Sequence, residues 1–264
     1  MTYGFRAPAD RRRLPDYISA LSGRYDFAEL WAPSPHLAED ARLCQAAGLF
    51  VTTHARFHDL TLGAADAEIR GLSVAQLRRD LAASAAAGAR LMVVHAGQLP
   101  WTDYPDPALS AEHADLRREE AEMRRAFLAR AVDSIAELAK AARAEGIRLA
   151  LENLPQPNEA PRTPEEMALF LPTGCDFCLD TGHAQMAGFA PADFLGPLGA
   201  RIAHLHLHRN DGIYDLHLPP RDPAPADFEG TALIELIRGG PEDYLALDFV
   251  RRADAATPNQ EMTR

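Results

Sequence analysis

Cysteine is scarce in this chain, which has three among 264 residues. That number is too small for a disulfide framework. Cys175 and Cys178 form a C-x-x-C, but they lie inside the strand-like run CDFCLD, whereas redox and zinc pairs normally occupy a turn or a helix start. No second pair accompanies them, so we predict buried structural thiols.

Long apolar runs and targeting signals are also missing. No stretch approaches the roughly 18 consecutive apolar residues that a membrane span needs, so no membrane association is expected. The opening segment MTYGFRAPAD has neither the apolar core nor the small-residue cleavage site of a secretory signal. We therefore expect a cytoplasmic protein.

Positive charge is in deficit, because 38 acidic residues outnumber 27 Lys and Arg and give a net charge of −11. Binding to a phosphate backbone depends on Lys and Arg neutralising the phosphates, so no nucleic acid partner is expected and a small substrate is favoured. No G-x-G-x-x-G or G-x-x-x-x-G-K-[ST] follows a predicted strand, which argues against a nucleotide-binding sheet.

Short apolar segments alternate with polar loops and with helical Ala- and Leu-rich stretches along the whole chain. The predicted strands lie near 3–5, 27–31, 50–53, 91–94, 148–151, 177–179, 202–207 and 244–249. The predicted helices lie near 11–22, 36–47, 71–88, 115–145, 164–171, 191–198 and 230–239.

This alternation implies parallel strands joined by helical crossovers. Eight such units in about 250 residues favour a closed (β/α)8 TIM barrel over an open doubly wound sheet, and residues 1–264 are expected to form a single domain. Two segments, 96–112 and 209–228, are predicted as extended loops, and long loops in compact barrels usually cover the site.

Acidic residues and histidines recur where the predicted strands end. In a barrel the carboxyl ends of the strands converge on one opening, here called the mouth, where active sites of this fold are built. One such histidine alone is more often structural, but six strands contribute. Glu152 follows an apolar strand, where a buried carboxylate needs a metal ion or an Arg partner to offset its charge. The six residues are His54, His95, Glu152, Asp180, His206 and Asp248.

Further candidates follow the sixth and seventh predicted strands. In LDTGHA, Gly182 is expected to allow a sharp turn that brings His183 back toward Asp180. In RIAHLHLHRND the period of two puts three histidines on one strand face. Among His204, His206 and His208, we favour His206 as the ligand, with His208 second. Asp215 and His217 then form a D-x-H in a loop, either over the mouth or simply on the surface.

Three segments carry a family resemblance: L-E-N after strand five, D-T-G-H after strand six, and H-x-H-x-H…N-D-G-x-x-D-x-H-L-P after strand seven. In this order they resemble the sugar phosphate isomerase/epimerase family of xylose isomerase-like barrels, whose superfamily includes the endonuclease IV type of DNA repair enzyme. The resemblance spans essentially the whole chain. It implies a TIM barrel with a divalent metal ion (Mn, Zn, Mg or Co) in the mouth.

The resemblance also implies roles for single residues. The metal ligands would be Glu152, Asp180, His206 and Asp248, with His95, His183, His208, Asp215 and His217 as further candidates. Glu152 and Asp248 would move protons beside a substrate carbonyl, and His183 would help to orient the substrate. The expected substrate contacts are His54, His95, Arg209, His217 and Trp31.

The chain departs from the family pattern at three places. Asp248 stands where the family usually has Glu, so this carboxylate reaches one methylene less far. His208, Arg209 and Asn210 replace H-D-N, so Arg209 stands where the family has an acid. This basic residue could bind a substrate carboxylate or phosphate. RDPAPADF replaces a glycine-rich loop after H-L-P.

The leading hypothesis is a metal-dependent isomerase or epimerase of a small sugar, sugar phosphate or related hydroxy-carbonyl compound. One alternative is a multinuclear-zinc phosphoesterase of the endonuclease IV type, with His54, His95, His183, Asp215 and His217 as extra ligands. The other is a metal-binding barrel without turnover. Barrel surfaces often pair, so a homo-oligomer also remains open.

Overall fold

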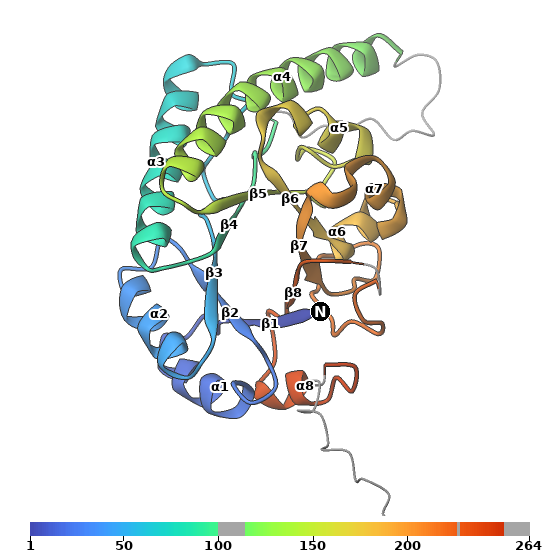
Figure 1. The fold of residues 1–264 in the computed structure, drawn as a ribbon. Coiled ribbons are helices and arrows are strands. Elements are labelled where there is room, and N and C mark those ends of the chain that lie inside the picture. The colour runs from blue at the N-terminus through green and yellow to red at the C-terminus, as the bar shows by residue number, and fades with distance from the viewer. Residues whose placement is uncertain (100–113, 226–227, 251–264) are drawn as a thin grey trace, which may run out of the picture.

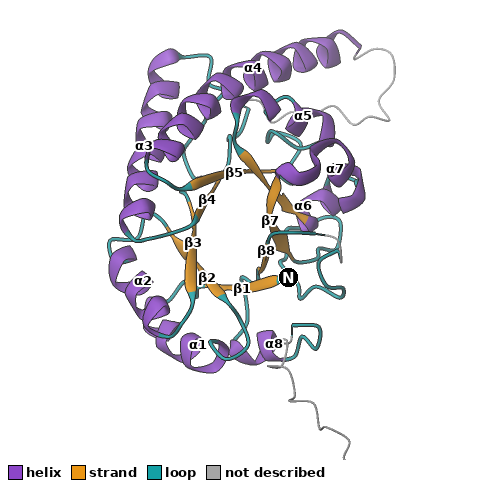
Figure 2. Cartoon of the chain, in the orientation of Figure 1, coloured by secondary structure: helices purple, strands orange, loops and turns teal. Residues whose placement is uncertain are grey.

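The chain folds into a closed barrel of eight parallel strands surrounded by helices (Figures 1 and 2). This computed structural model describes residues 1–99, 114–225 and 228–250. Each strand pairs with the next along the chain, and the last pairs with the first, Thr2 opposite Thr231. The predicted (β/α)8 fold is confirmed. Much of the predicted loop 96–112 and two residues of the loop 209–228 lie outside the described residues.

The strands are short, and the helices that follow them vary widely in length. The strands are β1 (Thr2–Arg6), β2 (Phe27–Trp31), β3 (Phe50–His54), β4 (Leu91–Val94), β5 (Arg148–Glu152), β6 (Asp176–Asp180), β7 (Ile202–Leu207) and β8 (Thr231–Ile234). The helices are α1 (Leu14–Leu21), α2 (Leu37–Ala46), α3 (Ala67–Ala86), α4 (Ala114–Ala144), α5 (Pro164–Ala168), α6 (Thr181–Met186), α7 (Pro191–Leu198) and α8 (Pro241–Leu245). Within the described part of the chain, no helix combines the length and the apolar character that crossing a membrane requires.

Burial on both faces explains why the strands read as continuous apolar runs. All four residues of β4, LMVV, are buried, as expected for a parallel strand covered by helices on one face and by the barrel interior on the other. Some of the helices start at side-chain caps. Asp66 accepts hydrogen bonds from the backbone N–H groups of Glu68 and Ile69 at the start of α3, and Thr163 caps α5.

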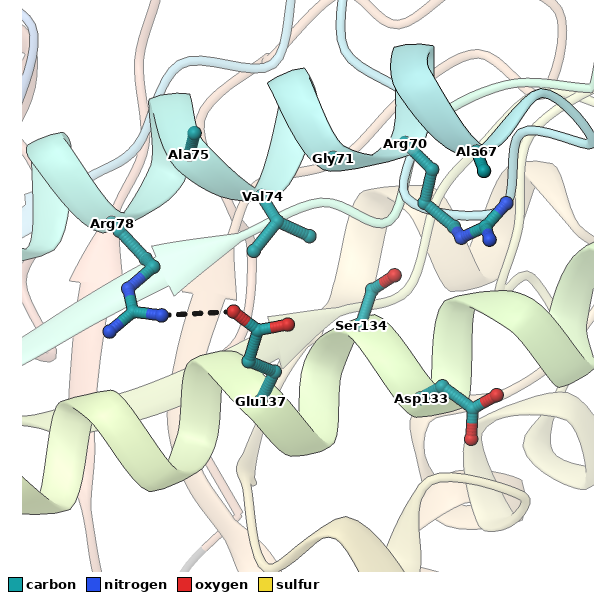
Figure 3. Close-up of a pocket in the computed structure, with 9 residues that line it drawn as sticks. All are labelled: Ala67, Arg70, Gly71, Val74, Ala75, Arg78, Asp133, Ser134 and Glu137. Atoms are coloured by element: carbon teal, nitrogen blue, oxygen red, sulfur yellow. Dashed lines mark hydrogen bonds and ion pairs between the residues drawn. The ribbon is translucent and has the colours of Figure 1, made fainter.

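A shallow cleft of about 330 Å³ lies between the two longest outer helices, α3 and α4 (Figure 3). Arg78 of α3 and Glu137 of α4 form an ion pair of 2.9 Å across it. The residues that line this cleft all come from these two helices rather than from strand ends. It is therefore a feature of helix packing and does not belong to the mouth.

The last β/α unit differs from the prediction. The segment 230–239, expected to be a helix, contains β8, and the segment 244–249, expected to be a strand, contains the end of α8 and the turn after it. A short apolar run such as TALI cannot be assigned to strand or helix by periodicity alone, and here pairing with β7 and β1 decides. Asp248 is consequently exposed in the turn after α8 and does not end a strand.

The three cysteines are free and buried, as predicted. Cys178 packs inside the barrel with Leu91, Val93 and two alanines. Burial raises the pKa of the Cys44 thiol to about 12 and that of Cys175 to about 11, and it raises the pKa of Cys178 well above its ordinary value. The reactive thiolate is therefore suppressed at all three positions.

These thiols should resist modification in the folded protein. With an excess of a chromogenic disulfide reagent at pH 8, we expect less than one thiol per chain to react over an hour, because each thiol is inaccessible and protonated. Three should react in denaturant. Fast labelling of one thiol without denaturant would contradict the buried assignment.

Candidate metal centre

Three carboxylates surround one histidine nitrogen in the mouth of the barrel. The Nδ1 atom of His206 lies 3.2 Å from Oε1 of Glu152, 3.2 Å from Oε2 of Glu235 and 3.7 Å from Oδ2 of Asp180. All four side chains are buried. The structure therefore brings together three of the four predicted ligands. The fourth predicted ligand, Asp248, does not lie with them, because it is exposed in the turn after α8. Glu235, which directly follows β8, takes the last position of the ring.

Asp180, the first residue of the D-T-G-H segment, is held through both of its carboxylate oxygens. Oδ1 accepts a hydrogen bond of 2.7 Å from the backbone N–H of His183 and caps α6, while Oδ2 lies 2.8 Å from Nε2 of His208. The Asn153 side chain bonds the backbone N–H and C=O of Asp180 at 2.7 and 3.0 Å. The cap, rather than a turn, brings His183 back toward the carboxylate.

Gly182 serves a different purpose from the one predicted. It belongs to helix α6, so the expected sharp turn is not formed there. A Cβ atom at this position would lie 2.1 Å from Cε1 of His208. Glycine is therefore needed because it leaves space for the His208 ring to approach Asp180.

Two further histidines meet the other oxygen of Glu152. Nε2 of His54 lies 3.3 Å and Nε2 of His95 lies 3.0 Å from Oε2. The Nδ1–H of His54 donates to the carbonyl of Ala55 at 2.8 Å, so in the neutral ring Nε2 carries a lone pair toward the carboxylate. Two such acceptors in contact require a proton or a metal ion between them.

A third group gathers under the loop that follows β7. His183 donates from Nδ1 to the carbonyl of Asn153 at 2.9 Å, which directs its Nε2 toward Oδ2 of Asp215 at 3.3 Å. Nε2 of His217 lies 3.0 Å from the same oxygen, and the His217 ring stacks on His208 with centroids 3.9 Å apart. The D-x-H pair therefore belongs to the mouth and not to the loop surface.

Asn210 holds this loop in place. Its Oδ1 accepts hydrogen bonds from the backbone N–H groups of Leu216 and His217, and its Nδ2 donates to Oδ1 of Asp215 at 3.0 Å. His217 has φ +49°, a left-handed conformation that is uncommon for residues other than glycine. Such strain is typical of functional sites, where surrounding contacts maintain it.

The close carboxylates and imidazoles shift one another's pKa values. Burial alone would raise the pKa of Glu152, but the facing His206 and His95 hold it well below its usual range. Burial would lower the pKa of His183, but Asp180, Asp215 and Glu152 together raise it to about 10. Burial dominates at His95 and lowers its pKa despite the adjacent Glu152. The carboxylates of the mouth therefore favour positive charge next to them, either on a protonated imidazole or on a bound cation.

The side chains of the mouth fit a divalent metal ion. Within the described residues, buried ring nitrogens of four histidines have no hydrogen-bond partner, including both nitrogens of His206, whose Nδ1 faces the three carboxylates. Oxygen and imidazole ligands together suit several divalent ions. Ligand atoms lie within 4.8 Å of one another in sets that include His54–His95–Glu152, Glu152–Asp180–His183, Asp180–His208–Glu235 and His183–His208–Asp215–His217. These sets offer more ligands than one ion needs.

Aromatic side chains form the rim beside His54 and His95. Trp31 is 39% exposed, and its ring lies over His54 with centroids 6.0 Å apart. Phe57, 37% exposed and not identified from the sequence, stacks on His95 at 4.9 Å and meets Trp31 edge-on. A cavity of about 1100 Å³ opens beside them and includes His95 in its wall.

The predicted substrate contact Arg209 lies in the loop after β7. Its Nε donates to the carbonyl of Pro219 at 3.0 Å, and its backbone pairs with Leu218. At least part of the guanidinium is therefore used to hold the loop 209–219 in place.

Two buried acids that contact His206 escaped the sequence analysis. Glu235 follows β8, which was read as a helix, so its strand-end position was not recognised. Glu29 lies within β2, in the run FAELW, where an acid among apolar residues of a strand was a signal of an interior charge. It lies 3.3 Å from Nε2 of His206.

Comparisons with known proteins agree with this architecture. The chain is 28% identical over 178 residues to an uncharacterised protein, MJ1311 of Methanocaldococcus jannaschii; the match covers 64% of this chain and spans about half (54%) of that relative. Among solved structures, it is similar to the TTHB071 protein from Thermus thermophilus soaked with ZnCl2, with a TM-score of 0.65, 25% identity and coverage of 95% and 98% of the two chains.

A D-psicose 3-epimerase from Clostridium cellulolyticum H10, solved with D-tagatose, has a TM-score of 0.66 and 21% identity, with coverage of 91% of this chain and 87% of that one. This likeness concerns the fold. The sequence model of the family described as xylose isomerase-like TIM barrel matches residues 16–234, which include every strand of the barrel except β1. The predicted resemblance is confirmed, and the chain belongs to the xylose isomerase-like TIM barrel family.

Proposed function

We propose that this protein is a divalent-metal-dependent isomerase or epimerase that acts on a small sugar, sugar phosphate or related hydroxy-carbonyl compound. The proposal is supported above all by one observation: Glu152 and Glu235 approach the same nitrogen of His206 at 3.2 Å from different strands, with Asp180 beside them. A bound divalent ion would polarise a substrate carbonyl and stabilise the enediolate that forms when the neighbouring carbon loses a proton.

The two glutamates are the groups that would move the proton. Glu152 comes from β5 and Glu235 from the end of β8, so the substrate carbon would have one carboxylate on each side. One glutamate, as the carboxylate, would take the proton, and the other, entering as the carboxylic acid, would give its own proton to the opposite face, which inverts the carbon; return of the first proton to the adjacent carbon instead gives isomerisation. Because the last acid is Glu235 and not Asp248, both side chains have the same reach.

Other residues of the mouth would bind and orient the substrate. The backbone carbonyl of Asn153 fixes the His183 ring, so its Nε2 can meet a substrate hydroxyl at a defined position. Trp31 and Phe57 present exposed ring faces that can cover the apolar side of a sugar ring. The net charge of −11 favours such a small substrate over a nucleic acid.

A second candidate function is hydrolysis of a phosphoester by a centre with two or three ions. It is favoured by the additional ligand sets, because His54 and His95 meet one oxygen of Glu152 while His183 and His217 meet Asp215. Paired ions suit this chemistry, since they stabilise both the attacking and the leaving oxygen. The two candidates therefore differ in how many ions the mouth holds.

Replacing Glu152 tests the centre common to both candidates. Glu152→Gln keeps the volume but removes the charge shared by two ligand sets, so bound metal should be lost and turnover should fall by at least about 100-fold. Elemental analysis measures the bound metal, and the circular dichroism spectrum shows whether the variant is folded. Glu145→Gln, on the exposed turn after α4, is the control and should keep its metal. Metal content and turnover unchanged in Glu152→Gln would rule out this centre.

The number of ions and the reaction distinguish the two functions. The isomerase should hold one ion per chain, and in D2O it should incorporate deuterium beside the carbonyl of ketohexoses or their phosphates. The phosphoesterase should hold two or three ions and release inorganic phosphate. Asp215→Asn should leave the ion count of the isomerase unchanged but lower that of the phosphoesterase by one. Phosphate release without deuterium incorporation would exclude the isomerase.

The aromatic rim predicts a binding effect that is separate from the chemistry. Trp31→Ala removes an exposed ring face worth about 1 kcal/mol to a stacked substrate, so KM should rise about five-fold while kcat stays nearly constant. Steady-state kinetics on the best ketose of the panel provide the measurement. Leu72→Ala, on the exposed side of α3, is a matched surface control. A fall in kcat with KM unchanged would show that Trp31 does not act through substrate binding.

A further inference from the structure

Glu29 is a buried acid in the barrel interior that the proposed chemistry does not use. It lies on β2 with 3% of its surface exposed. Its Oε1 lies 3.3 Å from Nε2 of His206, and its Oε2 lies 3.3 Å from Nε2 of His204. The hydroxyl of Thr52 donates to Oε2 at 3.0 Å. A carboxylate in such a place is costly unless its partners compensate it, so packing alone does not explain its presence.

His206 therefore has acids on both edges of its ring. Its Nδ1 faces Glu152, Asp180 and Glu235 at the mouth, and its Nε2 faces Glu29 at 3.3 Å, a charge contact in which no hydrogen bond is formed. The ring is completely buried, so it has little freedom to turn. Histidines that bind a metal through one nitrogen almost always direct the other N–H to a carboxylate, a carbonyl or water, which fixes the ring and strengthens the ligand.

Neighbouring side chains fix the Glu29 carboxylate in turn. His204 is fully buried, and its Nδ1 lies 2.6 Å from the hydroxyl of Thr231 at the start of β8. Thr52 on β3 donates its hydroxyl to the same oxygen, Oε2, that His204 faces. Glu29, Thr52, His204 and Thr231 thus form a polar floor beneath the mouth, contributed by four different strands.

We propose that Glu29 is a positioning residue for the metal centre: it holds Nε2 of His206 so that Nδ1 is presented to the ion between Glu152, Asp180 and Glu235. This inference rests on the proposed function only in requiring a divalent ion in the mouth. Glu29 itself contacts neither the ion nor the substrate, because the His206 ring lies between them. Its effect is on the affinity for the metal, whichever reaction the centre catalyses.

Zinc affinity of the full-length protein tests this role without a substrate. Glu29→Gln removes the charge at constant volume, and competition with a chromogenic chelator should show zinc binding weakened about 10- to 100-fold. Glu39→Gln, an exposed glutamate on α2, makes the same change in net charge and should bind zinc as the wild type does. The melting temperature of each metal-free protein is measured in parallel. A purely structural role would lower the melting temperature of Glu29→Gln and leave its zinc affinity unchanged, which overturns the proposal.

A measurement on the wild type does not depend on the variant folding. In the zinc-loaded protein, nitrogen NMR of the histidine rings should show a proton on Nε2 of His206 and the metal on Nδ1. Zinc on Nε2 of His206, or on neither nitrogen, overturns the positioning role. If the wild type binds no zinc, manganese, cobalt or magnesium, the proposed function itself fails. If it binds zinc and Glu29→Gln binds it equally well, only the role of Glu29 is rejected.

Discussion

The concentration of negative charge inside the barrel is the constraint on which the rest of the site depends. Glu152, Asp180 and Glu235 meet at one point, and Glu29 lies below them, each almost excluded from water. Carboxylates so close together and so poorly solvated are stable only beside positive charge. The histidines of the mouth supply that charge, and the hydrogen bonds to their second ring nitrogens help to keep it in place.

Histidines provide this charge because an imidazole can face two partners at once. His206 has carboxylates at both ring nitrogens, and His54 and His183 each use one nitrogen on a backbone carbonyl and turn the other toward an acid. The raised pKa of His183, about 10, and the lowered pKa of Glu152 are two results of the same attraction. A divalent ion would satisfy the same acids with a more compact charge, so the arrangement favours metal binding.

Most of the barrel and much of the site could be predicted from the sequence, because strand ends of a barrel converge whatever the loops between them do. His54, His95, Glu152, Asp180 and His206 were predicted in this way, and the period of two placed His206 on one strand face with His204 and His208. The prediction of the last β/α unit was wrong because TALI is too short to show a period. Its assignment as a strand depends on pairing with β1, at the far end of the chain. The space required at Gly182 depends on a distant ring and leaves no local pattern.

The error at β8 also changed the expected chemistry. An aspartate at the end of the ring would reach one methylene less far and weaken the case for proton transfer, whereas Glu235 matches Glu152 in length and shares His206 with it. The choice between the two candidate reactions depends on a neighbouring group, which touches Glu235 through His217 at 3.4 Å. In that group, Asp215 with His183 and His217 would bind a further ion in the phosphoesterase and would orient the substrate by hydrogen bonds in the isomerase. The same ring of acids therefore serves both candidate reactions, and occupancy of this neighbouring group decides between them.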